Sequence, residues 1–181
     1  MIKNKKALCY YICMEVKTPG KEVEHDIDFD EKGNVILKKK ENVVRGGKSR
    51  SSGVQFEARV RKDLEEKNFT VDKWSNNMDL EIEKVTPAKR KFNPYNKVMV
   101  IGTGFPDFIA IQKRGEFYKV IGVEVKQNGM LSKIEKEKCA LYLKLGIFNE
   151  ILIASKVKEG RRVKVIYDDF VEKYKKWLKN G

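Results

Sequence analysis

The sequence predicts an α/β domain in which helices flank a mixed central sheet. Apolar residues recur at helical spacing in some segments and form short runs of strand length in others. Two of the helical segments follow capping-box sequences, and turns rich in Gly and Asn separate the strands. From residue 53 the order is α-β-insert-β-β-α-β-β-α, which is typical of a layered α/β domain. The 181 residues suffice for one well-packed domain with a small appendage.

Residues 1–52 are predicted to form a β-rich extension that ends in a basic linker. Residues 7–16 have the character of a strand, and 22–30 alternate strictly between apolar and acidic side chains. A turn at 31–34 then leads into a second apolar run, so we expect an N-terminal β-hairpin. Residues 38–53 mix Lys and Arg with Gly and Ser, which predicts a flexible basic linker. It is either an ordinary solvated loop or a strip for phosphate contact, with Lys48 and Arg50 as the candidate contacts.

The second part of the chain, the domain predicted over residues 53–181, starts with a helix, a strand and a long insertion. Ser52 and Gln55 have capping-box spacing, and the apolar residues that follow at intervals of four line one helix face. Residues 69–74 read as a strand. Residues 75–97 are polar and contain two prolines, so we expect a long loop or irregular insertion, a feature that is often functional in compact domains.

The second half of the chain carries the clearest pattern. Ser132 and Glu135 form another capping box, and the helix that they begin should end near Gly146. A closing helix is expected from Asp168. The remaining apolar runs are predicted strands: 98–101, 108–111, 118–123, 151–154 and 163–166.

Composition narrows the class of protein. A formal net charge of +13 favours a polyanionic partner such as nucleic acid, although Lys- and Glu-rich surfaces also occur in proteins from hot environments. The three cysteines form neither a disulfide framework nor a CxxC metal spacing. No apolar stretch is long enough to cross a membrane, and the N-terminal apolar run lacks a signal-peptide cleavage site. We therefore expect a soluble cytoplasmic protein of prokaryotic type, without a membrane partner.

Two short sequence motifs contain the candidate catalytic residues. Asp107 precedes one predicted strand, and Glu124 and Lys126 end the next, where their spacing of two places both side chains on one face. If the two strands are neighbours, the carboxylates of Asp107 and Glu124 converge beside the Lys126 ammonium. Two carboxylates and a backbone carbonyl, that of Val125, suit Mg²⁺ or Mn²⁺. The alternative is that Glu124 and Lys126 form only an ion pair at a strand end.

These motifs, Pro106-Asp107 and Glu124-Val125-Lys126, resemble the signature of the PD-(D/E)xK nuclease superfamily over residues 53–167. The resemblance implies a restriction-endonuclease-like core and metal-dependent cleavage of DNA. It also implies a further catalytic and metal-ligating acid on the preceding helix, where Glu57 stands; the alternative for Glu57 is a favourable interaction with the helix dipole.

The resemblance extends to the second helix, which commonly presents a polar residue to the site. Glu135 or Lys138 matches that place, although neither is the glutamine that is frequent there. Lys133 and Lys138 are candidate nucleic-acid contacts. Many enzymes of this fold dimerise, so a homodimer is expected by resemblance only. The segment before Glu57 is somewhat similar to archaeal Holliday-junction resolvases, but the insertion at 75–97 departs from their compact pattern.

The sequence thus predicts a Mg²⁺-dependent endonuclease acting on DNA, of a repair, recombination or restriction type. The main alternative is a nucleic-acid-binding module on a nuclease fold that does not cleave. A basic structural protein of a ribonucleoprotein is a third interpretation, but it leaves the converging carboxylates unexplained.

Overall fold

The structure, a computed structural model, describes residues 24–29, 34–93, 98–102, 104–160 and 162–180. The chain divides into two compact units, Met1–Ser52 and Gly53–Gly181. The strand predicted over 7–16 lies outside the described residues. Within them, none of the helices has the length and apolar character required to cross a membrane.

The first unit contains a two-stranded antiparallel pair. Strand β1 (His25–Phe29) pairs with β2 (Val35–Lys39), with His25 opposite Lys39 and Phe29 opposite Val35. Helix α1 (Lys40–Glu66) begins directly after β2 and continues into the second unit.

The prediction of a flexible linker over 38–53 is wrong for the residues that belong to α1. The helix starts at Lys40 rather than after a cap at Ser52. The segment contains glycines but no proline, and a glycine in a helix costs only about 1 kcal/mol relative to alanine. Glu41 in the first turn also interacts favourably with the helix dipole. Lys48 and Arg50 are therefore exposed helical residues.

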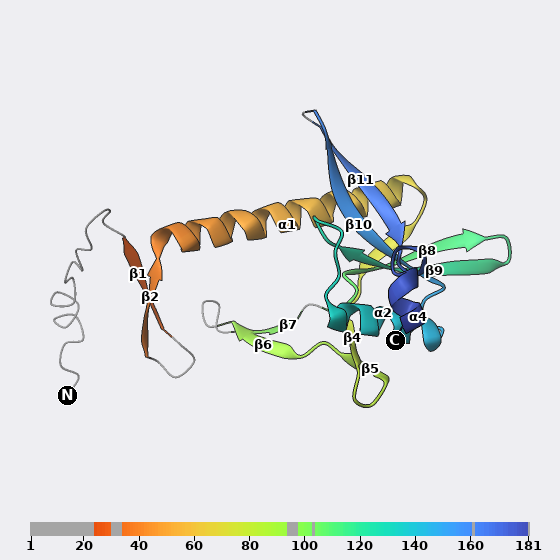
Figure 1. Cartoon of the computed structure of the whole chain (residues 1–181), viewed down its shortest axis with the longest axis horizontal. Helices are drawn as coiled ribbons and strands as arrows, with labels where there is room; N and C mark the ends of the chain where they lie inside the picture. The colour runs from red at the N-terminus through yellow and green to blue at the C-terminus, as the bar shows by residue number, and fades with distance from the viewer. Residues whose placement is uncertain (1–23, 30–33, 94–97, 103, 161, 181) are drawn as a thin grey trace. The chain divides into compact units, whose positions relative to one another are not determined.

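The second unit is built on a mixed sheet, which confirms the predicted α/β class. In the described residues this sheet has five strands in the order β11-β10-β9-β8-β3 (Figure 1). Strands β9 and β10 are parallel, and the other neighbours are antiparallel. The strands are β3 (Thr70–Lys73), β8 (Phe108–Arg114), β9 (Phe117–Val125), β10 (Glu150–Glu159) and β11 (Arg162–Asp169).

Each face of this sheet is covered by different helices, because alternate side chains of a strand point to opposite faces. On one face, α1 contributes its predicted apolar stripe, and the cluster there comprises Phe56, Val60, Leu64, Val71, Phe108, Ala110, Ile121, Val123 and Ala154. The other face packs against α2 (Lys133–Lys144) and α3 (Phe170–Lys173), with Tyr142, Phe148, Ile151, Ile153 and Phe170 at the centre of the cluster.

The prediction of a long loop over 75–97 is also wrong for the part that the structure describes. Strands β4 (Asn76–Asp79) and β5 (Lys84–Pro87) form one antiparallel pair. Strand β6 (Arg90–Asn93) pairs with β7 (Val98–Ile101), so the strand predicted at 98–101 is confirmed but lies outside the central sheet. These short strands could not be recognised in the sequence because the segment is mostly polar. Met78 on β4 is only 2% exposed and belongs to the core cluster on the α2 face of the sheet.

The helix that follows the second motif starts as predicted. Ser132 is the N-cap of α2, and Ser132 and Glu135 make both hydrogen bonds of a capping box. Gly146, just after the helix, has φ +66°, a conformation that favours glycine. The closing helix is shorter than predicted: Asp168 and Asp169 complete β11, and the helical residues divide into α3 and α4 (Lys175–Asn180).

Candidate functional site

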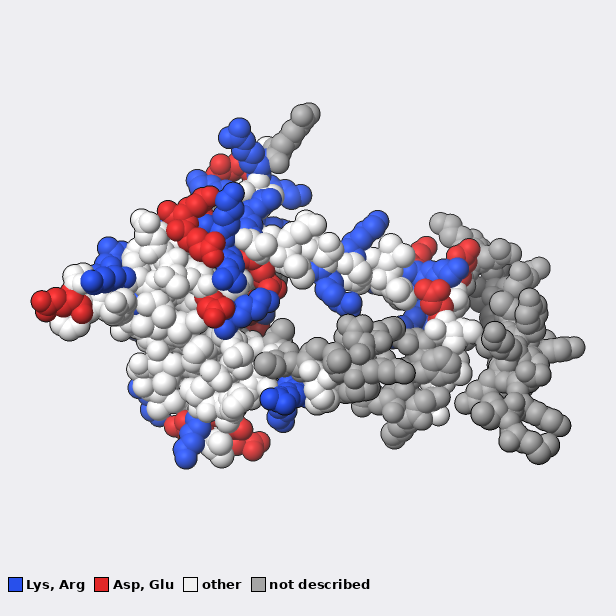
Figure 2. Space-filling view, turned by 180° about the vertical axis from the view of Figure 1, so that it is seen from behind, with Lys and Arg blue, Asp and Glu red and all other residues white. Residues whose placement is uncertain are grey.

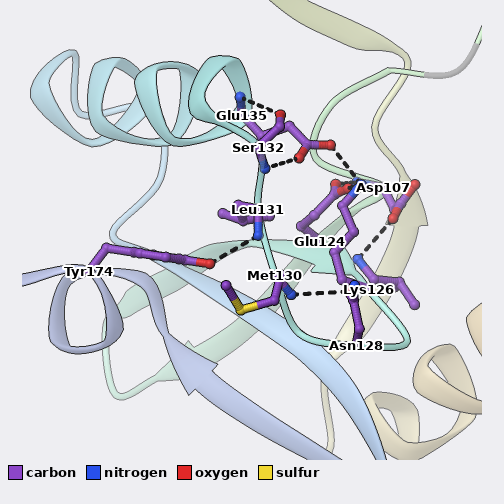
Figure 3. A network of polar contacts seen from close by, with 10 residues as sticks. Asp107, Glu124, Lys126, Asn128, Met130, Leu131, Ser132, Glu135 and Tyr174 are labelled. Atoms are coloured by element: carbon purple, nitrogen blue, oxygen red, sulfur yellow. Dashed lines mark hydrogen bonds and ion pairs between the residues drawn. The ribbon is translucent and has the colours of Figure 1, made fainter. Parts of the chain in front are cut away.

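Asp107, directly before β8, lies beside Glu124 on the neighbouring strand β9. The strand register pairs Phe108 with Val123, which places Asp107 opposite Glu124. The amide of Asp107 donates to Glu124 Oε2 at 3.1 Å, and the amide of Val125 donates to Asp107 Oδ2 at 2.9 Å. Each carboxylate is thus fixed by the backbone of the other strand. Both side chains lie on the α2 face, as Figure 3 shows.

Lys126 completes this group and links it to α2. Its Nζ lies 3.0 Å from Glu124 Oε1 and 2.6 Å from Glu135 Oε1. The second carboxylate oxygen of Glu135 accepts from the amide of Ser132 at 2.7 Å (Figure 3). The capping box that starts α2 therefore also holds the lysine beside the two acids.

Burial makes the acidic pair costly to ionise. Glu124 is 4% exposed, and its burial together with the negative charge of Asp107 raises its pKa to about 8. Burial also raises the pKa of Asp107, against the stabilising hydrogen bond from the Val125 amide. Two carboxylates that repel each other in a desolvated place favour either a shared proton or a cation.

Lys126, in contrast to the two acids, is stabilised in its charged form. Burial by itself lowers the pKa of Lys126, but its hydrogen bonds and ion pairs with Glu135 and Glu124 outweigh burial and raise the pKa above its usual value. Burial opposes ionisation of Glu135, yet its contacts with Lys126 and Ser132 lower its pKa. Lys126 and Glu135 are therefore a charged pair at neutral pH, so the positive charge beside the acids is permanent.

Glu57 lies near this group but has its own partner. Its Oε2 is 3.4 Å from Lys73 Nζ, at the end of β3. Glu57 and Lys73 act in opposite directions on the pKa of Asp107, which places both close enough to be felt electrostatically. Nothing in the sequence distinguishes Lys73 from other surface lysines, so its position beside the acids could not be predicted.

The donor set consists of two convergent carboxylates, with further oxygens nearby. Among the described residues, no cluster of three or more His, Cys, Asp or Glu side chains is arranged to hold a metal ion. Mg²⁺, however, is commonly bound by one or two carboxylates while it keeps several waters. The N–H and C=O of a strand residue point to the same side, so the carbonyl of Val125 faces the flank on which its amide meets Asp107. This donor set fits a hard divalent cation.

The loop after Lys126 is fastened at several points. The amide of Gly129 donates to the Lys126 carbonyl at 2.8 Å, and the amide of Met130 donates to Asn128 Oδ1 at 3.1 Å. Further along, the buried amide of Leu131 donates to the hydroxyl of Tyr174 at 2.9 Å (Figure 3). These contacts fix the path from the end of β9 to the capping box.

The predicted nucleic-acid contacts occupy different surroundings. Lys133 is 83% exposed in its side chain, and its ammonium is 3.9 Å from Glu137. Lys138 is partly buried: it donates to Asn77 Oδ1 at 2.8 Å and lies over the ring of Phe105. Lys138 thus ties α2 to β4.

No protein family, curated protein or solved structure matches the chain. The case for a function rests on the geometry and chemistry of the site.

Proposed function

We propose that the chain is a Mg²⁺- or Mn²⁺-dependent endonuclease that hydrolyses phosphodiester bonds of DNA, on a restriction-endonuclease-like core of the PD-(D/E)xK kind. One observation carries the proposal: Asp107, directly before β8, and Glu124, on β9, are held opposite each other, with the Lys126 ammonium 3.0 Å from Glu124. An ion pair alone does not require a second buried acid at the same point. A cation site does.

In this proposal Asp107, Glu124 and the carbonyl of Val125 hold the cation, and Glu57 supplies a more distant acid. A bound divalent cation polarises the phosphodiester and lowers the pKa of water, which makes a nucleophile available near neutral pH. The raised pKa of Glu124 means that the cation replaces a proton, so its binding should be accompanied by proton release.

Lys126 would orient the attacking water or stabilise the charge that develops on the phosphate. An ammonium has three N–H donors, and two carboxylates of the described chain, those of Glu124 and Glu135, occupy two of them. The third can face a water or a phosphate oxygen. Since both partners hold the same ammonium, it is positioned before substrate arrives, as electrostatic stabilisation of a transition state requires.

Replacement of Glu135 by glutamine should slow cleavage about 10- to 100-fold, a magnitude typical of a lost supporting contact to an active group. Glutamine can still complete the capping box, so the helix start is retained. The charge that holds Lys126 is lost. We expect the change in kcat rather than KM, because Lys126 acts in the chemical step.

Ser132→Ala is the matched control, because it removes the side-chain cap but leaves the Glu135 carboxylate. It should cost about 1 kcal/mol of stability and leave kcat within a few-fold of wild type. If Ser132→Ala slows cleavage as much as Glu135→Gln, the effect belongs to the helix start and not to the lysine.

DNA is the proposed substrate because of the net charge of +13 and because the Asp107 and Glu124 carboxylates suit a cation that activates a phosphodiester. A homodimer that places two such sites on one duplex is part of the proposal by resemblance only. The alternative of a binding module that does not cleave is decided by the same experiment.

The experiment is to incubate the full chain with linear duplex, nicked, branched and single-stranded DNA in Mg²⁺, Mn²⁺ or EDTA. Cation-dependent product from wild type, and none from Asp107→Ala or Lys126→Ala, is the expected result. Equal product from all three proteins would indicate a contaminating nuclease and reject the proposal. Binding without product in any condition would favour the non-cleaving module.

A further inference from the structure

Strands β10 and β11 extend beyond the rest of the central sheet. The pairing of β9 with β10 ends at Val125 and Ala154, whereas β10 and β11 remain paired up to Glu159 and Arg162. Within the part of the chain that the structure describes, residues 155–159 and 162–166, which we call the ribbon, therefore pair only with each other. Five residues of strand span about 17 Å. Figure 1 shows this two-stranded projection above the sheet.

The ribbon leaves the sheet at the edge that carries the proposed site. The amide of Lys126 donates to the carbonyl of Ala154 at 2.9 Å, and the ribbon begins at the next residue of β10. Since Glu124 is paired with Ile153, alternation along β10 and its register with β11 place Lys164 and Arg162 on the same sheet face as Glu124. A long ligand bound along that face would therefore extend to the proposed site.

The ribbon is strongly basic. It carries four basic side chains, Lys156, Lys158, Arg162 and Lys164, against one acid, Glu159. Lys158, Arg162 and Lys164 are exposed. Lys164 lies 3.6 Å from Glu159, but both side chains are more than 60% exposed, and such surface pairs are weak enough to exchange for a phosphate. Figure 2 shows basic side chains around this projection, with acidic side chains among them.

The ribbon is braced against α1 near its far end, at Val163, and next to its base, at Tyr167. Arg59 Nη1 donates to the carbonyl of Val163 at 3.2 Å, and the hydroxyl of Tyr167 donates to Asp63 Oδ2 at 2.7 Å. Val163 and Val165 pack against the cluster that α1 covers. These contacts hold the strands in place without using Lys158, Arg162 or Lys164. The support is therefore fixed, with Arg162 and Lys164 on the sheet face of Glu124 and Lys158 on the opposite face of the ribbon.

We propose that the ribbon is a DNA-binding arm that enters the major groove of a duplex and contacts its phosphates with Lys158, Arg162 and Lys164. The inference rests on the proposed function for its choice of partner. A two-stranded ribbon fits the major groove of B-form DNA, whereas that of A-form RNA is too deep and narrow. A second copy of the chain is a poor occupant, because two ribbons of the same charge repel.

The test compares two triple variants of the full chain that remove the same charge. The first is Lys158→Ala, Arg162→Ala and Lys164→Ala on the ribbon. The control is Lys84→Ala, Lys113→Ala and Arg114→Ala, which are also exposed and lie on β5 and at the far end of β8. Binding to a 25-base-pair DNA duplex, a matched RNA duplex and single-stranded DNA is followed by fluorescence anisotropy in EDTA, where cleavage is not expected.

For the ribbon variant we expect duplex DNA binding about 10- to 100-fold weaker, with the slope of log K against log salt reduced by about two to three. The control should stay within about threefold of wild type, and the ribbon variant should lose its preference for duplex DNA over RNA. Equal losses in both variants, equal losses for all three nucleic acids, or an altered oligomeric state of the ribbon variant alone would overturn the proposal. So would a wild type that does not bind duplex DNA.

The binding assay in EDTA and the cleavage experiment in Mg²⁺ or Mn²⁺ together separate the two proposals. Loss of binding in the ribbon variant without any cleavage by wild type would support the arm and reject the nuclease. Cleavage by wild type with unchanged binding in the ribbon variant would support the nuclease and reject the arm. Circular dichroism and thermal unfolding of each variant confirm that the fold is retained.

Discussion

Asp107→Asn should cleave DNA at least about a thousandfold more slowly than wild type in Mg²⁺. Asparagine has nearly the same shape and can still accept the hydrogen bond from the Val125 amide, which Asp107 receives at 2.9 Å. What it lacks is the negative charge that holds a hard cation, and loss of a metal ligand removes several kcal/mol of transition-state stabilisation. Single-turnover cleavage of a labelled substrate measures the effect on the chemical step.

The matched control for this variant is Asp72→Asn, which removes an exposed aspartate from the neighbouring strand β3. Because both substitutions change the net charge equally, a general loss of DNA affinity would affect them alike. We expect Asp72→Asn to retain cleavage within a few-fold. A comparable rate for Asp107→Asn and wild type would show that Asp107 takes no part in the chemistry.

Glu124→Gln should stabilise the cation-free protein at high pH while abolishing cleavage. The ordinary pKa of a glutamate is 4.5, and burial with Asp107 nearby raises that of Glu124 to about 8. Between these values the folded state keeps a proton that the unfolded state has released, so the free energy of unfolding falls as pH rises. Above pH 8 the folded state bears the full free-energy cost of the ionised, buried Glu124. Each pKa unit corresponds to about 1.4 kcal/mol, which gives roughly 3 to 5 kcal/mol.

Urea unfolding in EDTA at pH 5 and pH 9 measures this effect. Glu124→Gln should gain about 3 to 5 kcal/mol relative to wild type between the two pH values. Glu116→Gln, an exposed substitution in the β8–β9 turn, should follow wild type at both. Any pH-independent change in the free energy of unfolding caused by the glutamine itself cancels in the comparison between the two pH values. A difference between variant and wild type that does not change with pH would contradict the raised pKa.

Local patterns account for the parts of the site that the sequence predicted. The spacing of two between Glu124 and Lys126 fixes their common face, and the turn near Gly115 makes β8 and β9 neighbours, so Asp107 falls opposite Glu124. The capping box of Ser132 and Glu135 is likewise a short-range feature, and the structure confirms it. Each of these depends on residues close together in the chain.

The features that the sequence did not predict depend on distant residues or on weak preferences. The contact of Lys138 with Asn77 and the proximity of Lys73 to Asp107 need the tertiary fold. The N-terminal half of α1 contains Gly46 and Gly47, which resemble loop composition even though the helix tolerates them. The short strands within 75–97 carry few apolar residues, so alternation could not identify them.

Binding of Mn²⁺, followed by electron paramagnetic resonance, tests most directly whether the two acids form a cation site. Wild type should bind the ion and release it to excess Mg²⁺, and Lys126→Ala should still bind because the lysine is not a ligand. The double variant Asp107→Asn with Glu124→Gln should show no specific binding. If that double variant binds Mn²⁺ as wild type does, the cation lodges elsewhere and the proposed site is wrong.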